Sequence, residues 1–187
     1  ALATPLSNFE TNQGYKDRQD PSLTLIFPLI TDNAKFKDTN ILVWTTTPWT
    51  LPSNFAIAVG EDMDYNLVEQ DGKKFWCAAT RTAAYFKEAN VVDTCKGSEL
   101  VGLSYEPLFR LSDAYATSEE LEKRYKIYAA DFVSTEDGAG AVHIAPSFGE
   151  EDFQFGASIG LGLFDPPDTA GKSTDKVPLR QGPGATD

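Results

Sequence analysis

A short run of hydroxyl side chains between two tryptophans is the first place where this sequence could do chemistry. Residues 44–50 read Trp-Thr-Thr-Thr-Pro-Trp-Thr. Three adjacent hydroxyls at the end of an extended segment suit the binding of a small polar ligand, because they offer donors, acceptors and an aromatic wall together. Threonine also favours strands for reasons of packing alone, so a purely structural role is the alternative.

The residues before this run predict the element that positions it. Residues 40–46 are apolar and β-branched, which predicts a strand that ends before Pro48, since proline lacks the N–H that a sheet ladder needs. Side chains of a strand alternate between its two faces. One face should carry Ile41, Val43, Thr45 and Thr47, and the other Leu42, Trp44 and Thr46.

A second candidate stretch holds the only histidine of the chain. Residues 138–145 read Gly-Ala-Gly-Ala-Val-His-Ile-Ala, which predicts a strand over 139–144 that carries His143 and stops at Pro146. Ala141 and His143 should face one side, and Val142 and Ile144 the other. A lone histidine among apolar residues is more often a core or surface residue than a ligand.

An acidic helix start follows at once. We expect a helix over 148–159, capped either by Ser147 with Glu150 in a capping box or by Gly149. Either cap places Asp152 within about the first turn and a half. Such a carboxylate commonly serves only as a partner of the helix dipole, which contributes ~0.3–1 kcal/mol. The two tryptophans beside the threonines are likewise more often core residues than ligand platforms.

Composition limits the classes of function. The 187 residues are 41% hydrophobic and 12% aromatic, as in a globular protein. A net charge of −12 disfavours a general nucleic-acid binder, which needs a basic patch for phosphates.

No apolar run approaches the ~20 residues of a membrane span, so we expect no membrane partner. One histidine and two distant cysteines predict no metal site, and we expect no cofactor. The chain reads as a piece of a larger protein.

Many short apolar segments separated by turns predict a mostly β fold with short helices. We expect a mostly antiparallel barrel or curled sheet with helices at its ends. Asp71-Gly72 predicts a tight hairpin turn, and Thr117 or Ser118 is expected to cap a helical turn through Arg124. A further helix is expected over 81–89, with Thr80 as its cap. The predicted organisation is a linker at 1–21, a β-barrel domain at 22–165, and a loop or tail at 166–187.

Both candidate stretches resemble the editing domain of isoleucyl-tRNA synthetase, a class I aminoacyl-tRNA synthetase in which this domain is a connective insertion. The resemblance spans residues 4 to about 165 and rests on the run 44–50 and on the pattern Gly-x-Gly-x-Val-His-x-Ala-Pro-x-x-Gly-x-x-Asp. The valyl and leucyl enzymes usually carry arginine and an acidic residue around the proline, where this chain has Thr47 and Trp49. Ala139 departs from the threonine that is frequent between the two glycines.

The resemblance implies hydrolytic proofreading in the cytoplasm, within an isoleucine-tRNA ligase. Its substrate would be the valyl ester at the 3′ end of isoleucine tRNA, with valyl-adenylate as a further candidate. A pocket discriminates against one missing methylene by only ~1–3 kcal/mol, a limit for which isoleucyl-tRNA synthetase is itself the standard example. The implied partners are the 3′ end of aminoacylated tRNA, the valine moiety and the rest of the parent synthetase.

Seven side chains carry the implied site. Asp152 would pair with the α-ammonium of the substrate. Thr46 and Thr47, with help from Thr45, would hold the ribose and the ester and place a water. The pocket for the amino-acid side chain would be bordered by Trp49, Thr50 and His143. No activated nucleophile is visible, so direct attack by water is expected.

Two other classes remain open on the sequence alone. A degenerate barrel would hold the acceptor end of tRNA without cleaving it. An unrelated small-molecule hydrolase would use Asp152 and His143 as an acid–base pair. Ester loss from valyl-tRNA, from isoleucyl-tRNA and from simple esters discriminates among the three.

Overall fold

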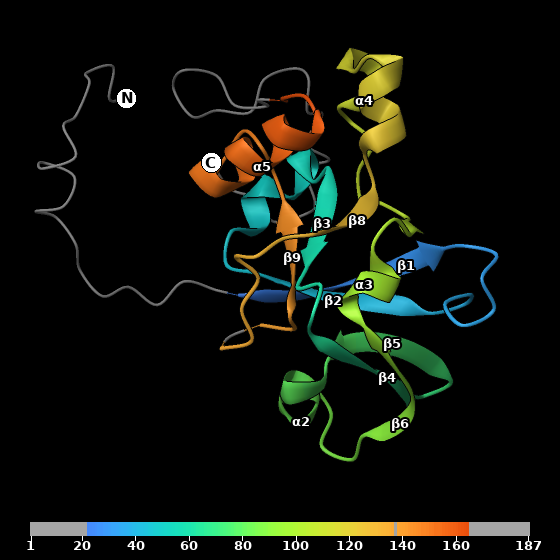
Figure 1. The fold of residues 1–187 in the computed structure, drawn as a ribbon. Helices are drawn as coiled ribbons and strands as arrows, with labels where there is room; N and C mark the ends of the chain where they lie inside the picture. The colour runs from blue at the N-terminus through green and yellow to red at the C-terminus, as the bar shows by residue number, and fades with distance from the viewer. Residues whose placement is uncertain (1–21, 137, 165–187) are drawn as a thin grey trace, which may run out of the picture.

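A computed structural model of the chain shows a fold centred on a closed β-barrel (Figure 1). The structure describes residues 22–136 and 138–164, so the predicted linker at 1–21 and the predicted tail at 166–187 lie outside the described residues. Six strands close the barrel in the order β1-β7-β8-β3-β9-β2, and β2 pairs back to β1. These are β1 (Leu23–Ile30), β2 (Asn40–Thr45), β3 (Ala56–Val59), β7 (Ser104–Tyr105), β8 (Lys126–Ala129) and β9 (Ala141–Ile144).

The barrel is mixed rather than wholly antiparallel. Four of its neighbouring pairs are antiparallel, as predicted, but β3 runs parallel to β8 and β2 runs parallel to β9. Parallel neighbours require long connections, so they join segments that lie far apart in the sequence. The β2–β9 pair matters most, because it brings together the two strands that carry the candidate residues.

A three-stranded extension continues the sheet beyond β2. The first residues of β2 pair with β5 (Lys73–Ala78), which pairs with β4 (Asp64–Gln70), which in turn pairs with β6 (Asn90–Lys96). Asp71 and Gly72 form the predicted hairpin turn, with φ of 52° and 73°. Positive φ at both central positions matches the right-handed twist of the flanking strands. In Figure 1 this extension, with α2, lies at the opposite end of the molecule from α5.

The helices are short except for α5 (Glu150–Ile159), which covers the outer face of β3 and β9 (Figure 1). The others are η1 (Pro48–Ser53), η2 (Ala79–Arg81), α2 (Thr82–Tyr85), α3 (Gly97–Leu100), η3 (Asp113–Tyr115) and α4 (Ser118–Lys123). No helix among the described residues has the length and apolar character to cross a membrane. The predicted Thr117 cap of α4 is confirmed, because its side chain accepts a hydrogen bond from the main-chain N–H of Glu120.

Three local predictions were wrong. The helix expected over 81–89 is a single turn, and Thr80 does not cap it, since it lies inside η2. The capping box at Ser147 does not form, because the Ser147 hydroxyl accepts a hydrogen bond from the N–H of Phe164, 17 residues away. The alternative, Gly149 as the cap of α5, is correct.

The predicted alternation of side chains along β2 and β9 is confirmed by the apolar clusters that these side chains join. Ile41, Val43 and Ala141 point into the barrel, where they pack in one apolar cluster. Leu42 and Trp44 face the opposite way and pack against the extension. Thr45 and His143 continue the inward-facing rows of β2 and β9, so the predicted faces place them at one end of the barrel interior.

Candidate functional site

The candidate residues gather where β2 and β9 end. The two strands run parallel with Trp44 opposite Val142, so their carboxyl ends lie at the same end of the barrel. Helix η1 follows β2 and α5 follows β9. Both helices therefore begin near this end, and the site is built from two stretches about ninety residues apart in the chain.

A chain of hydroxyl groups connects three of the four threonines. The Oγ1 atoms of Thr45 and Thr47 are 3.3 Å apart, and those of Thr47 and Thr50 are also 3.3 Å apart. The Thr45 hydroxyl also accepts the N–H of Thr47 at 3.0 Å. Thr45 and Thr50 are buried. The hydroxyls of Thr45, Thr47 and Thr50 are therefore hydrogen-bonded to one another, and these bonds stabilise the backbone that leads from β2 into η1.

His143 joins this chain through Thr50. The Thr50 hydroxyl donates its one hydrogen to the Thr47 carbonyl at 2.8 Å, so it must accept from the His143 Nε2–H, 3.1 Å away. This arrangement selects the tautomer protonated at Nε2. The other ring nitrogen, Nδ1, is buried and has no partner among the described residues. Desolvation lowers the pKa of His143 from 6.5 to about 4, so the ring is neutral at pH 7.

The depressed pKa of His143 makes the stability of the domain depend on pH. A histidine whose folded pKa lies below its unfolded value contributes stability above pH 6.5, and that stability is lost as pH falls toward 4. By linkage, the loss between pH 7 and pH 4.5 is about 2 kcal/mol of unfolding free energy. Urea unfolding at both pH values should show this extra loss in the wild type relative to His143→Gln. Equal losses in the two proteins would contradict the assignment.

Asp152 lies at the start of α5, beside the end of β9. Its Oδ2 accepts the main-chain N–H of Ala145 at 3.0 Å, two residues after His143. Burial raises the pKa of the Asp152 carboxyl, and the neighbouring charge of Glu151 adds to the rise, while the hydrogen bond from Ala145 opposes both. A half-buried carboxylate with no cation within ion-pair distance among the described residues suits a positively charged ligand group.

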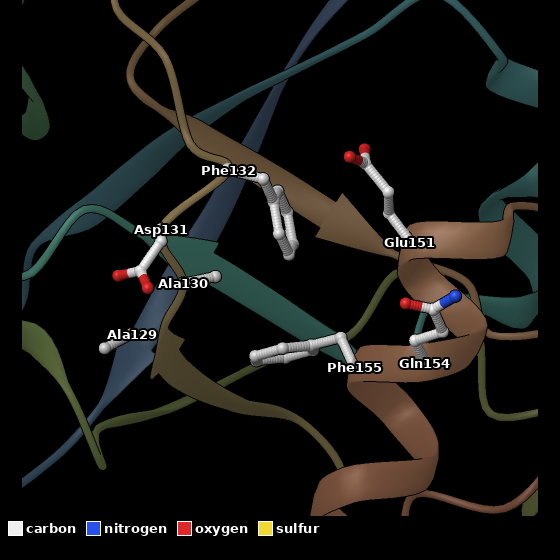
Figure 2. Close-up of a pocket in the computed structure, with 7 residues that line it drawn as sticks. All are labelled: Ala129, Ala130, Asp131, Phe132, Glu151, Gln154 and Phe155. Carbon is white, nitrogen blue, oxygen red and sulfur yellow. The ribbon is translucent and has the colours of Figure 1, made fainter.

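Clefts open on both sides of the helix that carries Asp152. One, of about 400 Å³, is lined by residues 129–132 and by Glu151, Gln154 and Phe155. Figure 2 shows the Phe132 and Phe155 rings converging inside it; their centroids are 5.7 Å apart at 90°. The other, of about 440 Å³, is lined by residues 146–150, Phe153 and Leu163. A third cleft, of about 300 Å³, reaches Trp44, the residue before Thr45.

The remaining predicted residues face outward. Thr46 is exposed, and Trp49, in η1, keeps 61% of its surface accessible to solvent. Neither belongs to the hydrogen-bonded chain, so both are available to a ligand. Within the described part of the chain, no group of three or more histidine, cysteine or acidic side chains is placed to hold a metal ion.

Contacts from the extension to residues 138–140, here called the glycine loop, were not anticipated from the sequence. The Arg81 Nε donates to the Gly138 carbonyl at 2.8 Å, and the Tyr65 hydroxyl donates to the Gly140 carbonyl at 2.5 Å. These partners are 57 and 75 residues apart in the chain. Local patterning carries no signal for such pairs.

Sequence relatives of this chain include isoleucine–tRNA ligases from several bacteria. The isoleucine–tRNA ligase of Bdellovibrio bacteriovorus is 44% identical over 183 residues, which cover 95% of this chain and 17% of the relative. The isoleucine–tRNA ligase of Rickettsia peacockii is 43% identical over 193 residues, covering 97% of this chain and 17% of the relative. The chain thus spans about a sixth of the length of these relatives. No family model matches the sequence.

Two solved structures share the fold at low sequence identity. GlLeuRS-CP1 aligns with a TM-score of 0.58 at 14% identity, covering 74% of this chain and 60% of that one. The cytosolic leucyl-tRNA synthetase editing domain of P. knowlesi aligns with a TM-score of 0.51 at 15% identity, covering 72% of this chain and 62% of that one. At such identities the likeness concerns the barrel and its helices alone.

Proposed function

The chain belongs to the isoleucine–tRNA ligase family, as a segment with the fold of a synthetase editing domain, and we propose that residues 22–165 hydrolyse wrongly attached valine. The substrate is valine esterified to the 3′ end of isoleucine tRNA, with valyl-adenylate as a second candidate. The partners are that acceptor end and the rest of the parent enzyme, in the cytoplasm.

One observation carries the proposal: the parallel β2–β9 pair joins the threonine run to His143 by a continuous chain of hydrogen bonds. The same strand end receives Asp152 through the Ala145 N–H. Hydroxyl, imidazole and carboxylate groups from distant parts of the chain thus lie toward the same end of the barrel. That combination matches what an aminoacyl ester presents, namely a ribose, an aliphatic side chain and an ammonium group.

Geometry and burial support distinct roles for the two titratable groups. Asp152 is the anionic partner for the substrate ammonium, a contact that orients the ester. His143, with a pKa of about 4, is neutral at pH 7 and too weak a base to move protons efficiently there. We therefore assign it to the pocket wall, where with Thr50 and Trp49 it limits the length of the aliphatic chain. This assignment disfavours an Asp–His acid–base pair.

The threonines position the reacting groups rather than attack. Thr46 is exposed, and it is the hydroxyl of the run best placed to meet the ribose or the ester. The half-buried Thr47 shares its hydroxyl with Thr45 and Thr50, so it holds the local backbone as well. A positioned water adds to the carbonyl carbon of the ester, and the bond between that carbon and the ribose oxygen breaks. The ribose oxygen takes up the proton that the water loses, and free valine is released.

Deacylation of purified aminoacyl-tRNA tests the proposal. The synthetase that carries this chain should release valine from valyl-tRNA(Ile) and leave isoleucyl-tRNA(Ile) intact. Triple replacement of Thr45, Thr46 and Thr47 by alanine should abolish the release, because it removes the three adjacent hydroxyls that position the ribose, the ester and the water. Circular dichroism of the variant provides the folding control. Retained valyl-tRNA in the wild type would indicate a module that only binds the acceptor end, and cleavage of simple esters would indicate a general hydrolase.

A further inference from the structure

The glycine loop is held by donors from the extension and from η2, which follows β5. The N–H of Ala78, at the end of β5, donates to the Ala139 carbonyl at 2.9 Å. The Tyr65 hydroxyl from β4 binds the Gly140 carbonyl, and the Arg81 guanidinium from η2 binds the Gly138 carbonyl. Three successive carbonyls are thus each fixed by a different element. The extension is therefore a scaffold for this loop.

The loop has little freedom of its own once it is held. Gly138 and Gly140 have φ of 72° and 76°, a region that side-chain-bearing residues rarely adopt. A Cβ on Gly140 would overlap the Cβ of Ala78, and a Cβ on Gly138 would lie 3.0 Å from the Cβ of Trp44. Close approach on both sides means that a shift of the loop must move its neighbours.

The loop also adjoins the two strands of the proposed site, β2 through packing and β9 through the chain itself. Gly138 packs on Trp44, which directly precedes Thr45 at the end of β2. Gly140 leads straight into β9, whose third residue is His143. The loop therefore contacts the residue that precedes the threonine run and leads directly into the strand that carries His143. Its position sets how the threonines and the imidazole lie relative to each other.

Arg81 differs from the other two donors in a way that makes it informative. Tyr65 is fully buried and Ala78 contributes only its main chain, so neither can be removed without damage to the core or to the strand. Arg81 is half-buried, and its Nη1 also donates to the Glu136 carbonyl at 3.1 Å. Its planar fork thus spans two carbonyls of the same segment, a geometry that a single ammonium group does not reproduce.

We propose that Arg81 is a positioning residue for the editing site, which it serves by fixing the glycine loop between the ends of β2 and β9. It touches no substrate. The inference rests on the proposed function, since its consequence is measured on valyl-tRNA. Because hydrolysis requires the water, ester and anchoring carboxylate in register, a loop displaced by a fraction of an ångström lowers the rate of the chemical step more than it weakens binding.

Steady-state deacylation of valyl-tRNA(Ile) by the full-length synthetase tests this role. In Arg81→Ala, kcat should fall by about tenfold or more while KM stays within about twofold, as expected for misplaced catalytic geometry. Arg81→Lys keeps the charge and one donor group, so it should restore part of kcat. Arg110→Ala is the matched control: Arg110 is exposed and pairs with Glu106 and Asp113, and its loss should leave both constants unchanged.

Hydrogen exchange supplies a readout that does not depend on activity. Amides of residues 138–143 should exchange faster in Arg81→Ala than in the wild type and in Arg110→Ala, while the exchange of β4 should stay unchanged. With an active wild type, an unchanged kcat in Arg81→Ala overturns the positioning role whatever the exchange shows. A wild type that leaves valyl-tRNA intact overturns the proposed function instead, and exchange at 138–143 that matches the wild type would then overturn the structural role of Arg81 as well.

Discussion

Replacement of Asp152 by asparagine is expected to lower kcat/KM for valyl-tRNA deacylation by at least about 30-fold. Truncating one partner of a desolvated charge pair costs about 2–5 kcal/mol, and each 1.4 kcal/mol is a factor of ten. Here the lost interaction is the one between the Asp152 carboxylate and the substrate ammonium. Asparagine keeps the side-chain oxygen that accepts the Ala145 N–H, so the junction between β9 and α5 should survive.

Stability should separate this effect from misfolding. Burial raises the pKa of Asp152, so its carboxyl favours folding below the unfolded pKa and loses that contribution as pH rises through the folded pKa. Asparagine removes that charge cost at pH 7, which offsets the lost helix-dipole interaction of about 0.3–1 kcal/mol. The unfolding free energy should therefore stay within about 1 kcal/mol of the wild type. Glu151→Gln, an exposed carboxyl on the same turn, is the matched control and should retain activity.

Replacement of His143 by alanine is expected to change selectivity more than rate. Removing the imidazole opens space at the end of the barrel, so the longer isoleucine side chain should enter and isoleucyl-tRNA should be deacylated. A pocket discriminates one methylene by ~1–3 kcal/mol, so the preference for valine should fall by about tenfold or more. The measurement is the ratio of kcat/KM for valyl-tRNA and isoleucyl-tRNA in the variant and in the wild type.

His143→Gln serves as the control for this change. Glutamine fills much of the same space and its amide can donate to the Thr50 hydroxyl, as the Nε2–H does. It should therefore keep much of the selectivity, while alanine loses it. If isoleucyl-tRNA stays intact with His143→Ala, the imidazole does not exclude the isoleucine side chain, and its assigned role in the pocket is wrong.

The elements of this fold were predictable where short-range chemistry decides them. The inward and outward rows of β2 followed from the alternation of Ile41 and Val43 with Leu42 and Trp44. The Asp71-Gly72 turn was predictable because aspartate and glycine tolerate the positive φ that a tight hairpin turn requires. The Thr117 cap was predictable because a threonine hydroxyl can accept an unpaired N–H at the start of a helix. The resemblance to an editing domain also came from sequence, because it rests on two motifs in a fixed order.

Errors arose where a distant partner competed with a local one. Ser147 had the spacing for a capping box, but its hydroxyl binds the N–H of Phe164, which follows α5. The barrel is mostly antiparallel, as predicted, but the sequence did not indicate that the pairs β3–β8 and β2–β9 run parallel. The local sequence pattern indicates neither the Ser147–Phe164 hydrogen bond nor the parallel strand pairs, since each depends on which distant segments pack together.

The sequence by itself determined the residue types of the candidate site, the strands that lead to the threonines and His143, the helix that carries Asp152, and the family to which they point. Only the tertiary structure decided that Thr50 meets His143, that burial keeps the imidazole neutral, and that Arg81 reaches the glycine loop. The physical reason is one of range. Backbone preferences act over a few residues, whereas desolvation and the hydrogen bonds of the site depend on pairings between segments 57 to 93 residues apart.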